Sequence, residues 1–188
     1  MDQPFYVPHF IVRKNLVSLV TKWVNKGWSV NYQDAQGNCA LMIAIEKNFI
    51  YVLTELLRAP DIDVNLANDR KVTPLDFAVF LRRIEMVEML LNKGANVSFR
   101  DDEGRTSLHT AAFWCSDAEV TSMLVAKDPR ACYIRNNEGK TPLDVAQKEH
   151  NFNVSYVITK TVKEFFVYAR MLTSGIEDVR VRRYCPRL

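Results

Sequence analysis

The residues best suited to chemistry in this 188-residue chain are its cysteines and histidines. Cysteine and histidine in close pairs bind zinc, and a cysteine or serine beside a histidine can act as a nucleophile. The cysteines are far apart in sequence and form no ligand spacing with the histidines, which leaves Cys39, Cys115, Cys132, Cys185, His9, His109 and His150 as isolated residues. We therefore expect small buried thiols in a reducing compartment, with no metal and no cofactor.

Catalytic motifs are equally absent from the sequence. No Ser-His-Asp order with a supporting motif, no glycine-rich phosphate loop and no pair of acids in an apolar cleft can be found. The sequence therefore predicts that the chain is not an enzyme and takes no small-molecule substrate.

Composition and charge set the class of protein. The hydrophobic fraction of 48% and the charged fraction of 25% are those of a globular protein. No apolar run approaches the roughly 20 residues of a membrane span, and the first residues lack the order of a signal peptide. We expect a monomer that is cytoplasmic or, alternatively, nuclear.

The elements that must position any functional residue recur along the chain. The position held by Cys39, Thr73, Thr106 and Thr141 returns at intervals of 34, 33 and 35 residues. The motifs around it are DAQGNCALMIA at 34–44, NDRKVTPLDFA at 68–78, DDEGRTSLHTA at 101–111 and NNEGKTPLDVA at 136–146. Segments with apolar residues at helical spacing follow each motif, which predicts a helix in the second half of each unit.

A period near 33 residues with T-P-L-x-x-A inside it resembles the ankyrin repeat, and the resemblance covers about residues 6–158. It implies an all-α ankyrin-repeat solenoid of helix-turn-helix units with β-hairpin loops, about five units including caps. The expected repeat domain is 1–172, with a basic tail at 173–188. The expected units are 6–33, 34–67, 68–100, 101–135 and 136–172, the last with an extended capping helix.

Single residues of the motif have expected structural roles. Gly37, Gly104 and Gly139 suit the tight turn at each hairpin tip, and the recurring threonine suits the start of a helix. The resemblance implies that His109, with Asp76 and Asp144 at the same position of other units, bonds the backbone of an adjacent hairpin. A capping helix of about 20 residues is predicted from Val154, with a break at 173–175.

In ankyrin arrays, a few variable positions facing the concave groove carry binding. The two positions before the turn between the helices read charged, charged, apolar, apolar, charged along the array: Arg13-Lys14, Glu46-Lys47, Phe80-Leu81, Phe113-Trp114 and Lys148-Glu149. An aromatic patch with a charged rim is typical of a protein-binding hot spot. The predicted site comprises Val72, Phe80, Leu81, Asp101, Asp102, Glu103, Arg105, Phe113, Trp114 and Glu138.

The chemistry of the expected partner follows from these residues. The acids at the tips favour a protein with basic residues near an apolar anchor. Two alternatives stay open: one ring of each pair could be turned inward, or the tail after Gly175 could cover the patch.

Two asparagines are candidate modification sites. Asn31 and Asn65 hold hairpin positions that are hydroxylated by an oxygen-sensing asparaginyl hydroxylase in many proteins that this chain resembles, and Leu57 lies eight residues before Asn65. The alternative is that asparagine was selected there for its turn conformation.

The last 30 residues carry seven lysines and arginines against three acids. The basic tail at 173–188, which is the last part of this stretch, is the one segment through which nucleic acid or a membrane surface could be bound. The sequence as a whole predicts an adaptor that binds a protein in its groove. The alternatives are an inhibitor of a transcription factor or signalling protein, and a recruiting subunit whose C-terminal segment docks a larger complex such as a ubiquitin ligase.

Overall fold

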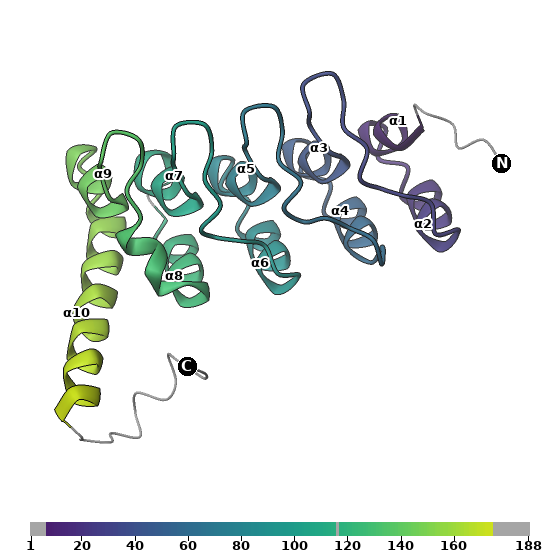
Figure 1. Ribbon diagram of the computed structural model, residues 1–188. Coiled ribbons are helices and arrows are strands. Elements are labelled where there is room, and N and C mark those ends of the chain that lie inside the picture. The colour runs from purple at the N-terminus through teal and green to yellow at the C-terminus, as the bar shows by residue number, and fades with distance from the viewer. Residues whose placement is uncertain (1–6, 116, 175–188) are drawn as a thin grey trace.

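Two layers of helices stack side by side along the molecule in the computed structural model, which describes residues 7–115 and 117–174 (Figure 1). The inner layer contains α1 (Val7–Arg13), α3 (Ala40–Glu46), α5 (Pro74–Phe80), α7 (Ser107–Trp114) and α9 (Pro142–Lys148). The outer layer contains α2 (Val17–Asn25), α4 (Ile50–Leu57), α6 (Ile84–Asn92), α8 (Ala118–Lys127) and α10 (Phe152–Ser174). Each inner helix is followed by an outer one, so the predicted all-α solenoid is confirmed.

The core of the solenoid is continuous from unit to unit. Leu41, Leu75 and Leu108, which hold the same position of three consecutive units, are each at most 1% exposed. Ala78 and Ala111 are fully buried three residues further on, and such small side chains let neighbouring inner helices approach closely. Each unit alone would leave this apolar face in water, so stacking is the main source of stability.

The recurring threonines begin the inner helices as predicted. The Thr73 hydroxyl accepts from the backbone N–H of Asp76, and Thr141 accepts in the same way from Asp144. A proline follows each of these threonines, where its missing N–H costs nothing. Cys39, which replaces threonine in the second unit, makes no side-chain cap.

The hairpin loops are held by one repeated turn. An aspartate or asparagine side chain at each tip accepts from the backbone N–H groups two and four residues later: Asp34, Asn68, Asp101 and Asn136. Gly37, Gly104 and Gly139 have the predicted positive φ, and Lys71 adopts the same conformation at 57° without being glycine. Within the described residues these loops form one isolated β-bridge, Gln33 with Cys39, so they are hydrogen-bonded turns rather than regular strands.

Gly37 and Gly139 provide a matched test of the packing between neighbouring tips, because both have φ of 74°. A Cβ at Gly37 would lie 2.7 Å from the Asp69 backbone nitrogen, whereas a Cβ at Gly139 would meet nothing within 4 Å. We expect Gly139→Ala to cost about 1 kcal/mol for the left-handed conformation. Gly37→Ala should cost about 1–3 kcal/mol more, since a backbone must also move. Chemical denaturation measures both, and equal losses would show that adjacent tips are not in firm contact.

The last outer helix is longer than the others. α10 runs for 23 residues, packs against α8 and α9 through the buried Val154 and Ile158, and continues past the outer layer (Figure 1). The predicted break at 173–175 is wrong for its first two residues, because the helix continues through Ser174. The remainder of the predicted basic tail, 175–188, lies outside the described residues, as do the side chains from position 165 onward. No helix in the described part of the chain is long and apolar enough to cross a membrane.

Candidate protein-binding site

Three aromatic rings from two consecutive units meet at the C-terminal ends of the inner helices. Phe80 is the last residue of α5, and Phe113 and Trp114 are the last two of α7. The Trp114 ring stands edge-on to Phe80, with centroids 5.5 Å apart, and lies 4.6 Å from the ring of Phe113. We call these three residues the ring cluster.

The buried face of α7 does not include these rings. Leu108, Ala111 and Ala112 are fully buried, whereas Phe80, Phe113 and Trp114 are 45%, 45% and 55% exposed. The rings therefore form a contiguous apolar surface that is exposed to water, and the core between the units is filled by other side chains. Large exposed apolar surface of this kind is a feature of interaction sites.

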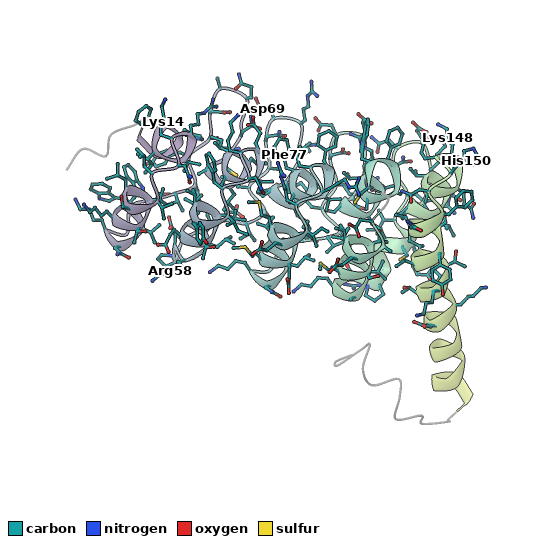
Figure 2. The ribbon with its side chains drawn as sticks, turned by 180° about the vertical axis from the view of Figure 1, so that it is seen from behind. Lys14, Arg58, Asp69, Phe77, Lys148 and His150 are labelled. Carbon is teal, nitrogen blue, oxygen red and sulfur yellow. The ribbon has the colours of Figure 1, made fainter. Side chains whose placement is uncertain are left out.

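Neighbouring positions extend the apolar surface. Leu81 is half-buried and packs against the core, as does Phe77, which lies one helical turn before Phe80. Figure 2 shows Phe77 in the inner layer, along the same edge of the molecule as Lys14 and Lys148 and away from Arg58 of the outer layer. Phe77 was not among the predicted site residues, although its i, i+3 spacing from Phe80 was visible in the sequence.

The predicted tip residues lie at the other end of the inner helices. Val72 and Arg105 directly precede the helix-capping Thr73 and Thr106, whereas the ring cluster ends the same helices. A seven-residue helix is about 10 Å long, so the tips and the rings form two separate parts of the inner surface. Val72 is half-buried and its N–H donates to the Asn68 side chain.

Each of the predicted tip acids is paired with a cation of this chain. Arg105 Nε lies 2.9 Å from Asp101 Oδ2, and its Nη1 lies 2.8 Å from Glu103 Oε2. Asp102 lies 3.4 Å from Lys71 Nζ, and Glu138 is paired with Lys140. The Asp101 side chain is only 9% exposed because it also holds its own turn together. The tips therefore present less free negative charge than the count of acids indicated.

The two candidate modification sites join consecutive units. The Asn31 Oδ1 accepts from the Asp63 backbone N–H at 2.9 Å, and the Asn65 Oδ1 accepts from that of Asn96 at 2.8 Å. Both side chains are half-buried. These bonds explain in structural terms why asparagine is present at both positions. Hydroxylation of these two residues stays a prediction.

The candidate titratable residues Asp76 and His109 are buried between units. His109 bonds the adjacent hairpin as expected, with Nε2 3.0 Å from the Lys140 carbonyl oxygen. Asp76 differs from the expectation, because it bonds the Ser107 hydroxyl of the next inner helix and the N–H and hydroxyl of Thr73. Burial raises the pKa of Asp76, despite these bonds. The exposed Asp144 accepts from Thr141 instead of from a neighbouring unit.

His109 makes stability depend on pH. Burial lowers the pKa of His109 from its ordinary 6.5, and its Nδ1 is within bonding distance of the Thr106 N–H, a bond that requires an unprotonated nitrogen. Because the unfolded chain binds this proton more tightly, the stabilising contribution is complete above pH 6.5 and is lost as the pH falls toward the folded-state pKa.

We expect His109→Gln to cost about 1–3 kcal/mol at pH 7.5, where its hydrogen bonds to Thr106 and Lys140 are intact. The stability difference between the two proteins should shrink as the pH falls below 6.5, as measured by urea unfolding across pH. A difference that is constant from pH 7.5 to 5 would contradict a neutral buried His109.

The buried cysteines have no geometry for chemistry. Cys39, Cys115 and Cys132 are free thiols, and burial raises the pKa of Cys39 and of Cys132 to about 11. A thiol with such a pKa is a poor nucleophile and a poor metal ligand at neutral pH. The described residues contain no group of three or more potential metal ligands.

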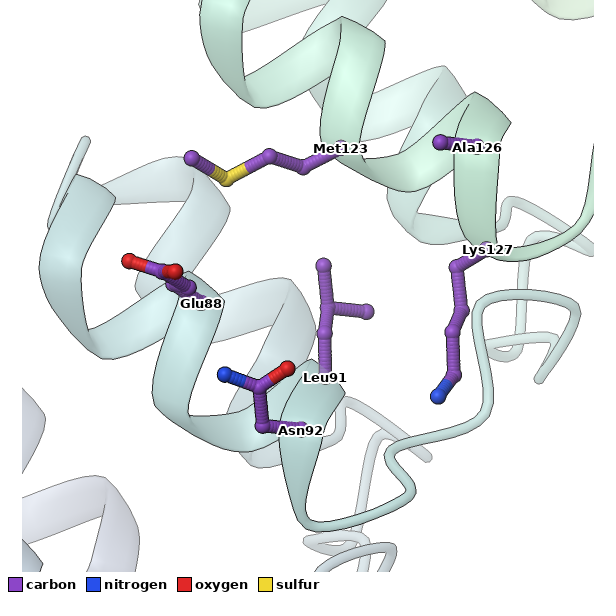
Figure 3. Close-up of a pocket in the computed structure, with 6 residues that line it drawn as sticks. All are labelled: Glu88, Leu91, Asn92, Met123, Ala126 and Lys127. Atoms are coloured by element: carbon purple, nitrogen blue, oxygen red, sulfur yellow. The ribbon is translucent and has the colours of Figure 1, made fainter. Parts of the chain in front are cut away.

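A shallow cavity of about 300 Å³ lies on the outer layer, between α6 and α8. It is lined by Glu88, Leu91, Asn92, Met123, Ala126 and Lys127, and Leu91 points into the gap from α6 (Figure 3). The cavity is formed by outer helices, whereas the ring cluster belongs to the inner helices. It brings together one acid and one lysine without a buried polar group to orient a small ligand.

Comparison with known proteins agrees with the geometry of the repeats. The family described as ankyrin repeats in three copies matches residues 9–101. The NF-kappa-B p105 subunit of Gallus gallus is 32% identical over 115 residues, which cover 57% of this chain and 11% of that protein. The ankyrin repeat protein FPV031 of fowlpox virus (strain NVSL) is 29% identical over 161 residues, 80% of this chain and 46% of that protein.

A third relative is the E3 ubiquitin-protein ligase Ufd4 of Drosophila melanogaster. It is 35% identical over 96 residues, which cover 51% of this chain and 3% of that protein. This chain thus spans less than half of each of these three relatives. The family match lies within the repeats, and ankyrin repeats are modules of protein–protein interaction. The repeat period, the helix caps, the stacked helix pairs and these matches all agree. The chain belongs to the ankyrin-repeat family.

Proposed function

We propose that this protein is a non-enzymatic adaptor that binds a partner protein through the inner surface of its repeats, with Phe80, Leu81, Phe113 and Trp114 as the anchor. The observation that carries the proposal is the ring cluster, in which Trp114 packs against both Phe80 and Phe113 and all three rings are about half exposed. Because stacked units are rigid, this surface exists before the partner arrives and little ordering entropy is lost on binding. We extend the proposal to a monomer acting in the cytoplasm or nucleus.

The charge of the partner is a separate part of the proposal. Basic residues of a partner would meet Asp102, Glu103 and Glu138, whose side chains are 52%, 69% and 68% exposed. They would have to compete with Lys71, Arg105 and Lys140, which already pair with these acids. The apolar anchor therefore has stronger support than basic complementarity at the tips.

Affinity capture from a eukaryotic lysate tests the proposal. The full chain is compared with a Phe80→Glu/Trp114→Glu variant and with a chain that ends at Ser174. We expect proteins captured by the full chain to be lost with the double variant and kept after truncation. Capture that survives in the double variant and disappears on truncation would assign binding to residues 175–188, including binding of nucleic acid or a membrane surface.

A recruiting subunit is the second candidate function, and α10 favours it. Phe152 and Tyr156, one turn apart on this helix, are 77% and 70% exposed. The repeats would bind the target protein, while α10 would bind a larger complex. This function predicts two sets of captured proteins, one lost with Phe80→Glu/Trp114→Glu and the other lost with Phe152→Ala/Tyr156→Ala. An inhibitor would instead bind a single regulatory protein and block its activity in a purified assay.

A further inference from the structure

The turns that follow the inner helices form a positively charged edge beside the ring cluster. We define this turn edge as the residues that end each inner helix and begin the next turn. Its cations are Arg13, Lys14, Lys47, Arg82, Arg83 and Lys148, and its carboxylates are Glu46, Asp117 and Glu149. Glu46 and Glu149 each lie within 4.0 Å of a neighbouring lysine, Asp117 caps the start of α8, and Arg13 is paired with Asp34.

Arg82 is the cation of the turn edge that is linked to both units of the ring cluster. It follows Phe80 and Leu81 in sequence, and it is close enough to hydrogen-bond Cys115, the residue after Trp114. Its side chain is exposed, and within the described residues it makes no ion pair. The adjacent Arg83 has a buried Nε without a hydrogen-bond partner, so donor capacity is left unused in this turn.

The backbone gives a second reason to single out Arg82. Four turns between paired helices contain a residue with φ between 54° and 58°, and these residues are Asn15, Asn48, Arg82 and His150. Asparagine and histidine are enriched in this left-handed conformation, whereas arginine is not. The turn would form more readily with asparagine, so the backbone conformation gives no reason for arginine here. Strained positions of this kind concentrate at functional sites.

We infer that the ring cluster and Arg82 together bind an acidic segment of a partner protein, one whose aromatic or leucine side chain enters the rings while a neighbouring carboxylate meets the Arg82 guanidinium. The inference rests on the proposed function and specifies the partner's charge. Arginine is suited to this role because its planar fork pairs with carboxylates through two parallel hydrogen bonds. The cations of the turn edge would add attraction for acids further along the segment.

Selection from a displayed library of random 12-residue peptides tests this. Peptides that bind the full chain but not Phe80→Ala/Trp114→Ala are ring-dependent, and we expect them to carry aspartate or glutamate next to an aromatic or leucine residue. Arg82→Asn should weaken these peptides about tenfold in fluorescence anisotropy, as expected for a lost charge-assisted pair. Lys71→Asn, which removes a cation at the tips, is the matched control and should change affinity less than about twofold.

The outcomes separate the two claims. Ring-dependent peptides that are neutral or basic would overturn the inference and leave the proposed function intact, as would an Arg82→Asn effect no larger than that of Lys71→Asn. A failure to find any ring-dependent peptide would count against the proposed function and the inference together. The Arg82→Asn variant should have the same unfolding temperature as the wild type or a higher one. A lower unfolding temperature together with unchanged peptide affinity would assign Arg82 to stabilising the end of α5, and it would overturn the inference.

Discussion

Replacing Leu108 by alanine will lower the free energy of unfolding by about 2–5 kcal/mol, the range for leucine truncations in a packed core. Leu108 is fully buried at the start of α7, which packs against α5 on one side and α9 on the other. The cavity would thus lie between units, where the two neighbouring inner helices are held apart by their own caps and turns and can close it only in part.

Leu19 provides the matched control, since it is 42% exposed on α2. Leu19→Ala removes the same atoms and should cost less than about 1 kcal/mol, because most of that surface is already in water. Urea or thermal unfolding followed by circular dichroism measures both. Similar losses for the two variants would contradict an inter-unit core centred on the repeated leucine.

The second large effect concerns binding. Phe80→Glu/Trp114→Glu will weaken a groove-bound partner at least about a hundredfold, because hot-spot aromatics contribute about 2 kcal/mol or more each and the new carboxylates would also lie in a desolvated contact. The two rings touch, so their single effects should not add. Titration calorimetry with a captured partner measures the loss.

The control for this variant carries the same change of charge elsewhere. Leu19→Glu/Tyr51→Glu alters two exposed apolar residues of the outer helices α2 and α4 and should leave affinity within about twofold. Both variants should keep the wild-type unfolding temperature within a few degrees, since none of the four residues is buried. Equal losses of affinity in the two variants would point to a general effect of negative charge instead of a site at the rings.

Local features of the fold were the most predictable from sequence. The threonine caps, the positive φ of the tip glycines and the leucine positions follow from residues within a few places of one another, and they are confirmed. Lys71 shows the limit of that reasoning, because it takes the turn conformation of glycine when Asn68 bonds the surrounding backbone. The turn after α8 shows the same limit. It contains no glycine, and Asp128 instead caps a short 3-10 helix, η1 (Pro129–Tyr133).

Contacts between units were harder to predict, since they depend on how side chains 30 or more positions apart are oriented after stacking. The contact of Phe80 with Trp114 and the bond from Ser107 to Asp76 are of this kind. The same limit explains the tips, where the sequence showed four acids but not their ion pairs with Lys71, Arg105 and Lys140. For the inner surface of the repeats, the number of acids in the sequence was therefore a poorer guide to the exposed groups than the positions of the apolar residues.

Hydroxyl-radical footprinting of the protein with and without its captured partner would test the central claim most directly. The molecule carries its own reference set, because Tyr51, Phe152 and Tyr156 are exposed rings at other places on the surface. We predict that the partner will reduce oxidation of Phe80, Phe113 and Trp114 several-fold and leave that of Tyr51 unchanged. Protection confined to Phe152 and Tyr156, or to Tyr51, with the ring cluster still fully reactive, would contradict binding at the inner surface.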